Sequence, residues 1–274
     1  MKNPPAILGK IAESTIKRVA KAKEALSFEQ IKSKFLTADG TCGSFTNQRE
    51  RKNMFHKALA APGLSFICEV KKASPSKGII SEDFPWMEIA KDYEEGGAAA
   101  ISVLTEPEFF LGSDQYMREI SAAVKIPTLR KDFIIDEYQI YEAKLWGAGA
   151  VLLICALLEP LTLSGFISIA DNLELDCLVE IHNEREAEEA IGAGARIIGI
   201  NNRDLTTFNV DTELTSRLKN KIPSGILTVA ESGINNTDDI RRLKETGADA
   251  VLIGESLMRS ADRKQFLKEM LSFS

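Results

Sequence analysis

The sequence is poor in the residues that bind transition metals. Its 274 residues include two histidines, His56 and His182, and four cysteines, and neither an HExxH nor a CxxC spacing occurs. Zinc sites in proteins need three or four such ligands, usually with two of them close together in the chain. We therefore expect no protein-ligated metal.

The four cysteines lie far apart, at positions 42, 68, 155 and 177. Cys68 and Cys177 fall inside apolar runs, which favours reduced thiols in a hydrophobic core over a disulfide framework. No apolar run reaches the length of a membrane-spanning helix, and no signal-peptide pattern opens the chain. These absences predict a cytoplasmic protein without a membrane partner.

Excess positive charge is also missing, since the formal net charge is −6 and the pI is about 5.3. Proteins that bind nucleic acids usually present a basic face to the phosphates, so we expect no nucleic-acid partner.

A dinucleotide fingerprint is absent too. Gly192-x-Gly194 precedes an apolar run instead of following one, and Ile197 stands at the third glycine position, which disfavours NAD and FAD.

What the chain does contain is a series of eight short apolar runs. They are spaced about 24 residues apart, which suits a strand plus a crossover helix. The expected strands cover residues 66–70, 98–104, 126–129, 151–154, 177–179, 196–200, 226–230 and 248–253. The expected helices between them cover residues 86–95, 115–124, 136–146, 184–193 and 238–246.

The character of these runs predicts the fold class. They are apolar on both faces, as in a parallel sheet covered by helices. Four follow a Gly-Ala pair that begins at Gly97, Gly149, Gly194 or Gly247, where the glycine would end a helix in a left-handed turn. We predict an α/β fold, a (β/α)8 TIM barrel, with a doubly wound open sheet as the alternative.

Residues 1–62 lie outside this repeat and predict an N-terminal helical extension on a barrel domain of residues 63–274. Ser27 and Gln30 form a capping-box start for a second helix, and residues 37–47 are rich in small polar residues typical of a loop. The first helix, over residues 5–26, has apolar residues at helical spacing: Ile7, Leu8, Ile11 and Val19. This apolar face predicts an extension that packs on the barrel and covers part of its mouth, or alternatively a dimerisation arm.

Charged or amide residues stand at the C-terminal edge of the runs. In a parallel barrel these edges meet at one mouth, where barrel enzymes have their active sites. Each such residue alone fits a surface ion pair, but several carboxylates buried together are not placed there for stability. The cluster therefore predicts acid–base chemistry by Glu69, Lys71, Lys131, Glu180, Asn201 and Glu231, with Thr105-Glu106 and Glu255 at two further strand ends.

Small residues after the last two expected strands predict a phosphate site. Ser232-Gly233 follows the seventh strand and Gly254-Glu255-Ser256 follows the eighth. Barrels commonly present backbone N–H groups to a phosphate at these two loops. The loop of residues 72–78, rich in Ser, Lys and Gly, predicts a mobile lid that can bind an anion, with a solvated connector as the alternative.

Seven ordered motifs in this chain resemble the indole-3-glycerol phosphate synthase family. They are EVKKASPSKG (69–78), SVLTE (102–106), LRKDFI (129–134), LVEIH (178–182), GINNRDL (199–205), AESGI (230–234) and LIGESLM (252–258). The resemblance implies a barrel with an N-terminal helical extension, acting in tryptophan biosynthesis without a cofactor. The implied substrate is 1-(2-carboxyphenylamino)-1-deoxyribulose 5-phosphate, and the products are indole-3-glycerol phosphate, CO2 and water.

The resemblance also implies a monofunctional enzyme without a fused isomerase domain, and we expect a monomer or weak homodimer. The six residues at the strand ends match the family's catalytic positions. Its substrate-binding positions are matched by Ser74, Arg203, Ser232, Gly233, Gly254 and the backbone of Glu255 for the anionic groups, and by Phe110 and Phe133 around the anthranilate ring.

The chemistry assigns roles to these groups. Lys131 is suited to protonate the ribulose carbonyl, and Lys71 and Glu180 are candidates for the dehydration. Glu69 and Glu231 would keep the lysines charged, although which lysine serves which step stays open. Two other functions also stay open: a lyase that forms a Schiff base on a lysine, and a non-catalytic barrel that binds a phosphorylated ligand.

Overall fold

The computed structural model describes residues 2, 6–35 and 53–274. Eight parallel strands form a closed barrel in the order β1-β10-β9-β8-β7-β6-β5-β4, so the predicted barrel is confirmed and the open sheet is wrong. The strands are β1 (Ser65–Val70), β4 (Ala100–Leu104), β5 (Thr128–Lys131), β6 (Ala150–Ile154), β7 (Asp176–Ile181), β8 (Ile197–Asn201), β9 (Leu227–Glu231) and β10 (Ala250–Ile253).

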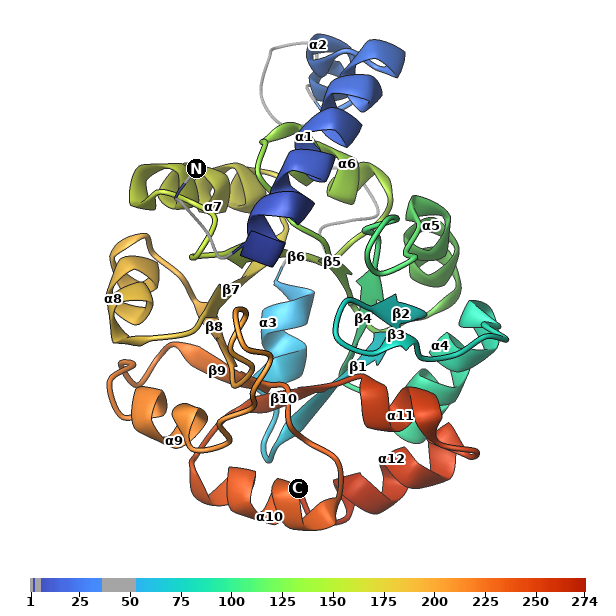
Figure 1. Cartoon of the computed structure of the whole chain (residues 1–274), viewed down its shortest axis with the longest axis vertical. Coiled ribbons are helices and arrows are strands. Elements are labelled where there is room, and N and C mark those ends of the chain that lie inside the picture. Colours follow the sequence, from blue (N-terminus) through green and yellow to red (C-terminus); the bar gives the residue numbers. More distant parts are fainter. Residues whose placement is uncertain (1, 3–5, 36–52) are drawn as a thin grey trace.

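Helices surround this barrel as an outer ring (Figure 1). They are α4 (Trp86–Gly96), α5 (Asp114–Ala123), α6 (Tyr138–Leu145), α7 (Pro160–Asn172), α8 (Glu184–Gly192), α9 (Leu214–Lys219), α10 (Thr237–Glu245), α11 (Glu255–Arg259) and α12 (Arg263–Leu271). Because the ring covers the outside of the sheet, β1, β4, β6, β7 and β10 are buried at every position. Both faces of these strands are therefore covered, as expected of a parallel sheet with helices around it.

Left-handed glycines precede three of the expected strands. Gly97, Gly194 and Gly247 have φ values of 102°, 90° and 73°. The same prediction for Gly149 is wrong, because Gly147 takes the left-handed turn with a φ of 86°. The chain reads Gly-Ala-Gly-Ala here, so the spacing matches either pair. Gly149 instead meets the preceding strand closely, where a Cβ would lie 3.3 Å from the Cβ of Pro127.

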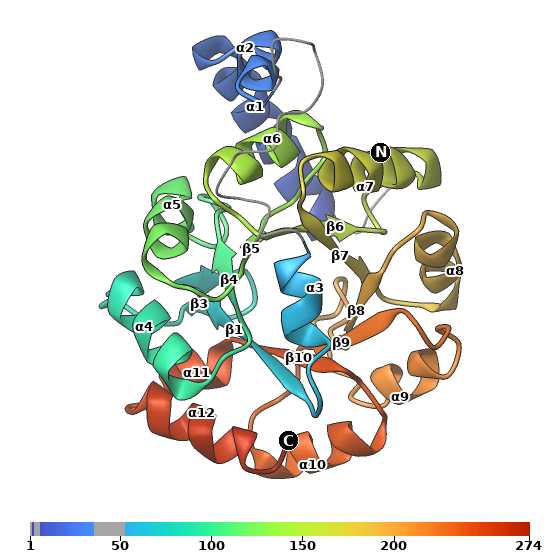
Figure 2. The ribbon, with the colours of Figure 1, turned by 180° about the vertical axis from the view of Figure 1, so that it is seen from behind.

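The N-terminal helices contact both ends of the barrel: α1 (Ala6–Ala25), α2 (Phe28–Ser33) and α3 (Met54–Leu59). The N-terminal end of α1 reaches the edge of the mouth and the rest of the helix runs outward past α6, whereas α3 lies at the opposite end (Figures 1 and 2). Arg18 on α1 forms two hydrogen bonds to the Asp132 carboxylate, at 2.7 and 3.0 Å. At the other end, the backbone N–H of His56 donates to Asp176 Oδ2 at 3.0 Å. Helices α1 and α3 therefore both contact the barrel.

One local prediction for the extension falls on described residues and is confirmed. Ser27 and Gln30 form the predicted capping box at the start of α2. The loop expected at residues 37–47 lies outside the described residues, as does Cys42. Cys68, Cys155 and Cys177 are buried free thiols. None of the helices in the described ranges is both long and apolar enough to cross a membrane.

The predicted lid is a short hairpin. β2 (Ala73–Ser74) and β3 (Gly78–Ile79) pair antiparallel after β1, with Ser74 opposite Gly78. Lys77 reaches from the hairpin to Glu255 at the start of α11, with Nζ 3.7 Å from Oε1. The loop is thus a short hairpin at the mouth of the barrel. Its mobility stays a prediction.

Candidate active site

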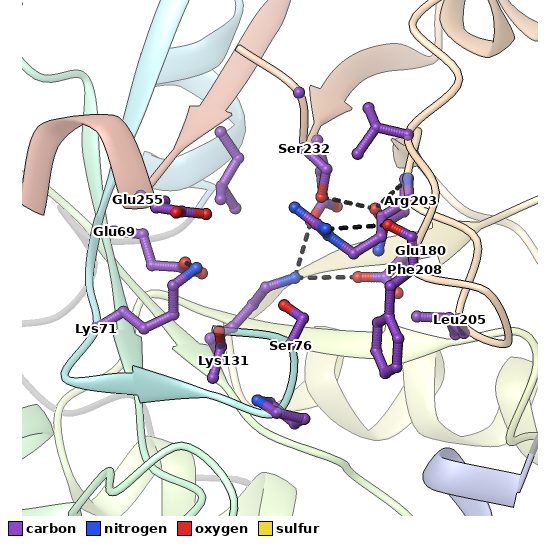
Figure 3. Close-up of a pocket in the computed structure, with 18 of the residues that line it drawn as sticks. Glu69, Lys71, Ser76, Lys131, Glu180, Arg203, Leu205, Phe208, Ser232 and Glu255 are labelled. Atoms are coloured by element: carbon purple, nitrogen blue, oxygen red, sulfur yellow. Dashed lines mark hydrogen bonds and ion pairs between the residues drawn. The ribbon is translucent and has the colours of Figure 1, made fainter. Parts of the chain in front are cut away.

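One cavity of about 720 Å³ occupies the mouth of the barrel. This volume is in the range of sites that hold a small molecule. All six residues expected to do chemistry line it: Glu69, Lys71, Lys131, Glu180, Asn201 and Glu231. All eight residues expected to bind substrate line it as well: Ser74, Phe110, Phe133, Arg203, Ser232, Gly233, Gly254 and Glu255. In Figure 3, several of these groups reach the cavity from different strands and loops: Glu69, Lys71, Lys131, Glu180, Arg203, Ser232 and Glu255.

Lys131, the last residue of β5, lies between two carboxylates. Its Nζ is 2.8 Å from Glu231 Oε2 and 3.0 Å from Glu180 Oε2, and the bond to Glu180 is drawn in Figure 3. Burial alone would lower the pKa of this amine, but the charges of Glu231 and Glu180 outweigh it and raise the pKa. Lys131 is therefore an ammonium with a proton to donate.

The two carboxylates around Lys131 differ in their environments. Burial raises the pKa of both. For Glu180, the charges of Lys131 and His182 reverse this effect, and the pKa is lowered. For Glu231, burial and the like charge of Glu180 raise the pKa to about 7. Two acids whose pKa values are pushed apart can serve as base and acid at the same pH.

Glu69 and Lys71 form an ion pair on the opposite side of the mouth (Figure 3). They are two residues apart at the end of β1, so both point into the barrel. Two glycines leave room for the buried acids. A Cβ on Gly254 would lie 2.5 Å from Glu69 Oε2, and a Cβ on Gly199 would overlap Glu231 Oε1. The interior of the barrel thus holds carboxylates where neighbouring positions lack side chains.

Asn201 links these acids to the predicted phosphate site. Its Oδ1 accepts hydrogen bonds from Ser232 Oγ at 2.9 Å and from the backbone N–H of Arg203 at 3.1 Å. Because Oδ1 is used in this way, the amide nitrogen is turned toward Glu180, to which it is hydrogen-bonded. The side chain therefore orients a carboxylate at one end and a loop at the other.

The predicted phosphate loop has an unusual backbone. Ser232 and Gly233 have φ values of 67° and 87°, so two successive residues are left-handed. Left-handed residues in turns can aim neighbouring N–H groups at an anion. Asn202, which is 2% exposed, holds the turn through a bond from Nδ2 to Ser232 O at 3.2 Å. Arg203 adds a guanidinium at the rim, where Nη1 donates to Phe208 O at 3.2 Å.

Apolar side chains line another part of the cavity. The rings of Phe110 and Phe133 lie 5.8 Å apart with an interplanar angle of 38°. Ile7, Leu8 and Ile11 of α1 also line the cavity, in agreement with the expectation that the extension covers part of the mouth. Sequence reasoning missed Leu205 and Phe208, in the loop after β8. The apolar face of α1 was visible in the sequence, but which part of the barrel it covers depends on tertiary packing.

Sequence reasoning also included a glutamate that is not in the cavity. Glu106 accepts backbone N–H bonds from Glu108, Phe109 and Phe110 at 3.0, 2.7 and 3.0 Å. It therefore shapes the loop after β4. Its neighbour Thr105 donates to Asp132 Oδ2 at 2.7 Å. The expectation that the polar end of this strand reaches the mouth is wrong for Glu106.

Sequence reasoning also missed a buried network below Lys131. Asp132 accepts hydrogen bonds from Arg130 Nη2 at 2.9 Å and from Arg18 on α1. Burial raises the pKa of Asp132, but the charges of these arginines lower it much further. Three adjacent charged residues in LRKDF were the only local signal. Among the described residues, no group of three His, Cys, Asp or Glu side chains is arranged to hold a metal ion.

The fold and the site define a class of protein. A (β/α)8 barrel with buried lysines and carboxylates around a cavity at its mouth has the form of an enzyme that acts on a small molecule. Residues 8–270 match the family model of indole-3-glycerol phosphate synthase. The chain belongs to this family.

Individual relatives agree with the family model over almost the whole chain. An indole-3-glycerol phosphate synthase from Ruminiclostridium cellulolyticum is 56% identical over 256 residues, covering 93% of this chain and 95% of the relative. The same enzyme from Endomicrobium trichonymphae is 52% identical, covering 96% and 99%. The one from Lachnoclostridium phytofermentans is 48% identical, covering 97% and 99%.

Solved structures of more distant proteins share the fold. Thiamine phosphate pyrophosphorylase from Pyrococcus furiosus superposes with a TM-score of 0.58 and 19% identity, covering 82% of this chain and 96% of the other. KGPDC from Streptococcus mutans has a TM-score of 0.61 and 10% identity, covering 76% and 96%. At these identities the likeness concerns the barrel alone.

Proposed function

We propose that this chain converts 1-(2-carboxyphenylamino)-1-deoxyribulose 5-phosphate into indole-3-glycerol phosphate, CO2 and water at the mouth of the barrel. This is the reaction of a carboxy-lyase in tryptophan biosynthesis. The observation that carries the proposal is the buried ammonium of Lys131 between Glu180 and Glu231. That group provides a proton donor and a base in a chain that belongs to the synthase family.

The lining of the cavity supports a definite placement of the substrate. The carboxyphenyl ring fits the apolar part around Phe110 and Phe133. The phosphate fits the loops at Ser232-Gly233 and Gly254-Glu255, with Ser74 and Arg203 as further partners. The ribulose chain between these two ends is then left to the lysines and glutamates.

Ring closure begins when the aromatic carbon that carries the carboxylate attacks the ribulose carbonyl carbon. The carbonyl oxygen takes a proton from Lys131 Nζ and becomes a hydroxyl. The lysine is left as a neutral amine beside Glu231. Because burial raises the pKa of Glu231 to about 7, this acid holds a proton near neutrality and can return it to the amine.

The remaining steps need one acid and one base. Loss of CO2 returns an electron pair to the ring and restores aromaticity. Dehydration then removes the hydroxyl as water, with a proton from Lys71, and Glu180 takes the proton from the carbon next to nitrogen. Glu69 keeps Lys71 charged through their ion pair. Exchange of the two lysine roles stays open.

Two competing functions are tested against this one. A Schiff-base lyase needs a neutral lysine, whereas the carboxylates around Lys131 raise its pKa. Borohydride trapping with substrate distinguishes the two, because only a Schiff base becomes covalently reduced. A non-catalytic phosphate-binding barrel predicts affinity without turnover.

The decisive experiment follows the fluorescence of the indole product with purified protein. Lys131→Met should lose at least about a thousandfold in turnover while substrate affinity stays within about tenfold, because the lysine acts mainly in the transition state. Lys72→Met, next to the ion pair but outside the cavity lining, should leave turnover unchanged. Near-normal turnover in Lys131→Met contradicts the assignment.

We also propose a cytoplasmic enzyme that needs no cofactor, binds no nucleic acid and forms a monomer or weak homodimer. Dialysis against a chelator should leave turnover unchanged. Sedimentation velocity over a range of concentrations should give a monomer with at most a weak concentration-dependent dimer. A tight oligomer would refute this last part without affecting the reaction.

A further inference from the structure

One titratable side chain next to Glu180 has no part in the reaction described so far. His182 follows the end of β7 and, being two residues beyond Glu180, projects to the same side. It does not line the cavity. Its Nε2 is 3.5 Å from Glu180 Oε1, and its Nδ1 is 3.3 Å from Glu186 Oε2 in the first turn of α8. The imidazole therefore lies between two carboxylates, behind the site.

This placement between two carboxylates favours the protonated, positively charged form of the ring. A neutral imidazole has one N–H and one lone pair, so it would turn a lone pair toward one of the two carboxylates. Only the imidazolium presents an N–H to both of them. Its Nε2 is buried and makes no hydrogen bond to any described residue, so its contact with Glu180 Oε1 at 3.5 Å is one of charge. Glu180 Oε1 is thus the group that this nitrogen faces.

The outer carboxylate is held in place. Glu186 Oε2 accepts the backbone N–H of His182 at 2.8 Å, and Oε1 accepts from Asn183 Nδ2 at 3.0 Å. Asn183 in turn caps α8 by accepting the N–H of Glu186 at 3.0 Å. The helix start therefore fixes the position of Glu186, and through it the orientation of the imidazole.

We propose that His182 is a positioning residue for Glu180, and this inference rests on the function proposed above. As an imidazolium bound to Glu186, it keeps the Glu180 carboxylate ionised and oriented, with Oε2 left to accept from Lys131 Nζ at 3.0 Å. It also supplies a third cation. While Glu231 is ionised, the site holds three carboxylates, Glu69, Glu180 and Glu231, against two lysines.

The charged groups that face His182 come from several elements. They are Glu180 on β7, Glu186 on α8, Glu231 on β9, Asp204 in the loop after β8 and, beyond Glu180, Lys131 on β5. Burial lowers the pKa of His182, but the hydrogen bond to Glu186 and the nearby carboxylates raise it more. The balance favours the charged form, in line with the carboxylates on both sides of the ring.

The first test separates positioning from a merely structural role. His182→Gln keeps an amide near Nε2 but removes the charge, so the pKa of Glu180 should rise. We expect kcat to fall about tenfold, KM to stay within about threefold, and the acidic limb of the kcat profile to move up by about one pH unit. His56→Gln, which changes the only other histidine, should alter none of these. An unchanged pH profile in folded His182→Gln overturns the proposal.

The second test does not depend on activity. With two histidines in the chain, ring signals in an NMR titration can be assigned by substitution. Coupling is reciprocal, so Glu180→Gln should lower the titration midpoint of His182 by about one pH unit and leave His56 unmoved. An unmoved His182 midpoint also overturns the proposal. If the wild-type protein forms no indole product, the proposed function fails, while this coupling can still be measured.

Discussion

At the scale of single residues, the protonation of the site depends on the small number of cations beside its carboxylates. Glu180 and Glu231 accept from the same lysine, so their titrations are linked and one of them takes up a proton first. Burial and the like charge of Glu180 make Glu231 that residue. An acid with a pKa of about 7 beside Lys131 is what a proton-returning group requires.

This assignment predicts the effect of Glu231→Gln. The wild-type protein should lose kcat as pH rises through about 7, because Glu231 gives up its proton there. The Gln variant cannot donate this proton, so kcat should fall about a hundredfold and that limb should disappear. The measurement is kcat between pH 5.5 and 9. An alkaline limb that survives in the variant belongs to another group.

At the scale of elements, the loops after β8 and β9 form one unit at the predicted phosphate site. Asn202 connects them, since its Oδ1 also accepts from Thr215 Oγ1 at 2.9 Å while its Nδ2 donates to Ser232 O. Val210, in the loop after β8, pairs with Arg203 across a short bridge and lies against Gly233. Asn202 and Val210 thus hold the left-handed turn at Ser232 and Gly233 in place.

Gly233→Ala tests this support. The added Cβ would lie 2.5 Å from Val210 Cγ1, and the φ of 87° is unfavourable for alanine. KM should rise more than tenfold, whereas kcat should change far less, because the lysines and glutamates are untouched. Gly225→Ala is the matched control, because Gly225 precedes β9 and a Cβ there would meet no atom within 4 Å. Equal losses for ligands with and without a phosphate would place the phosphate elsewhere.

An ion pair between Arg18 and Asp132 holds the first helix of the extension, α1, on the barrel. Arg18 → Met removes two hydrogen bonds to Asp132, whose side chain is 0% exposed, while Arg18 itself is 25% exposed. We expect the free energy of unfolding to fall by about 2 kcal/mol, less than for a fully buried pair because solvent screens the arginine. KM should also rise, since α1 contributes Ile7, Leu8 and Ile11 to the cavity.

Urea unfolding and steady-state kinetics measure both effects. Lys17→Met, on the exposed side of the same helix, is the control and should change neither. A destabilised variant with unaltered KM would mean that α1 closes the mouth without shaping the substrate site. Whether residues 1–62 and 63–274 are separable units stays a prediction.

At the scale of the whole molecule, the same network predicts how the protein responds to acid. Arg130 and Arg18 hold the pKa of Asp132 below its usual range, so the folded state favours the ionised carboxylate. The stability gained is complete above about pH 4 and is lost as pH falls toward the folded-state pKa. Asp132→Asn should be less stable at pH 7 and lose less on acidification. Thermal unfolding between pH 7 and 3 tests this, and parallel curves contradict it.

Much of this molecule could be predicted from the sequence because its signals are local. Each strand is a short apolar run with its polar residue at one end, and the barrel topology then brings Glu69, Lys131 and Glu231 together. His182 gave a local signal too, two residues from Glu180, but its charge depends on Glu186 in the next helix. The contact between Arg18 and Asp132 joins residues 114 positions apart, and no pattern in either segment indicates it.

Gly199 and Glu231 occupy one volume between them, since a methyl group on the glycine would overlap the carboxylate. The two positions are therefore sterically coupled. Alanine at position 199 would push the tip of the Glu231 side chain out of its present place. Because the other oxygen of that carboxylate accepts from Lys131 Nζ at 2.8 Å, one methyl group on β8 would disturb the ammonium without touching it.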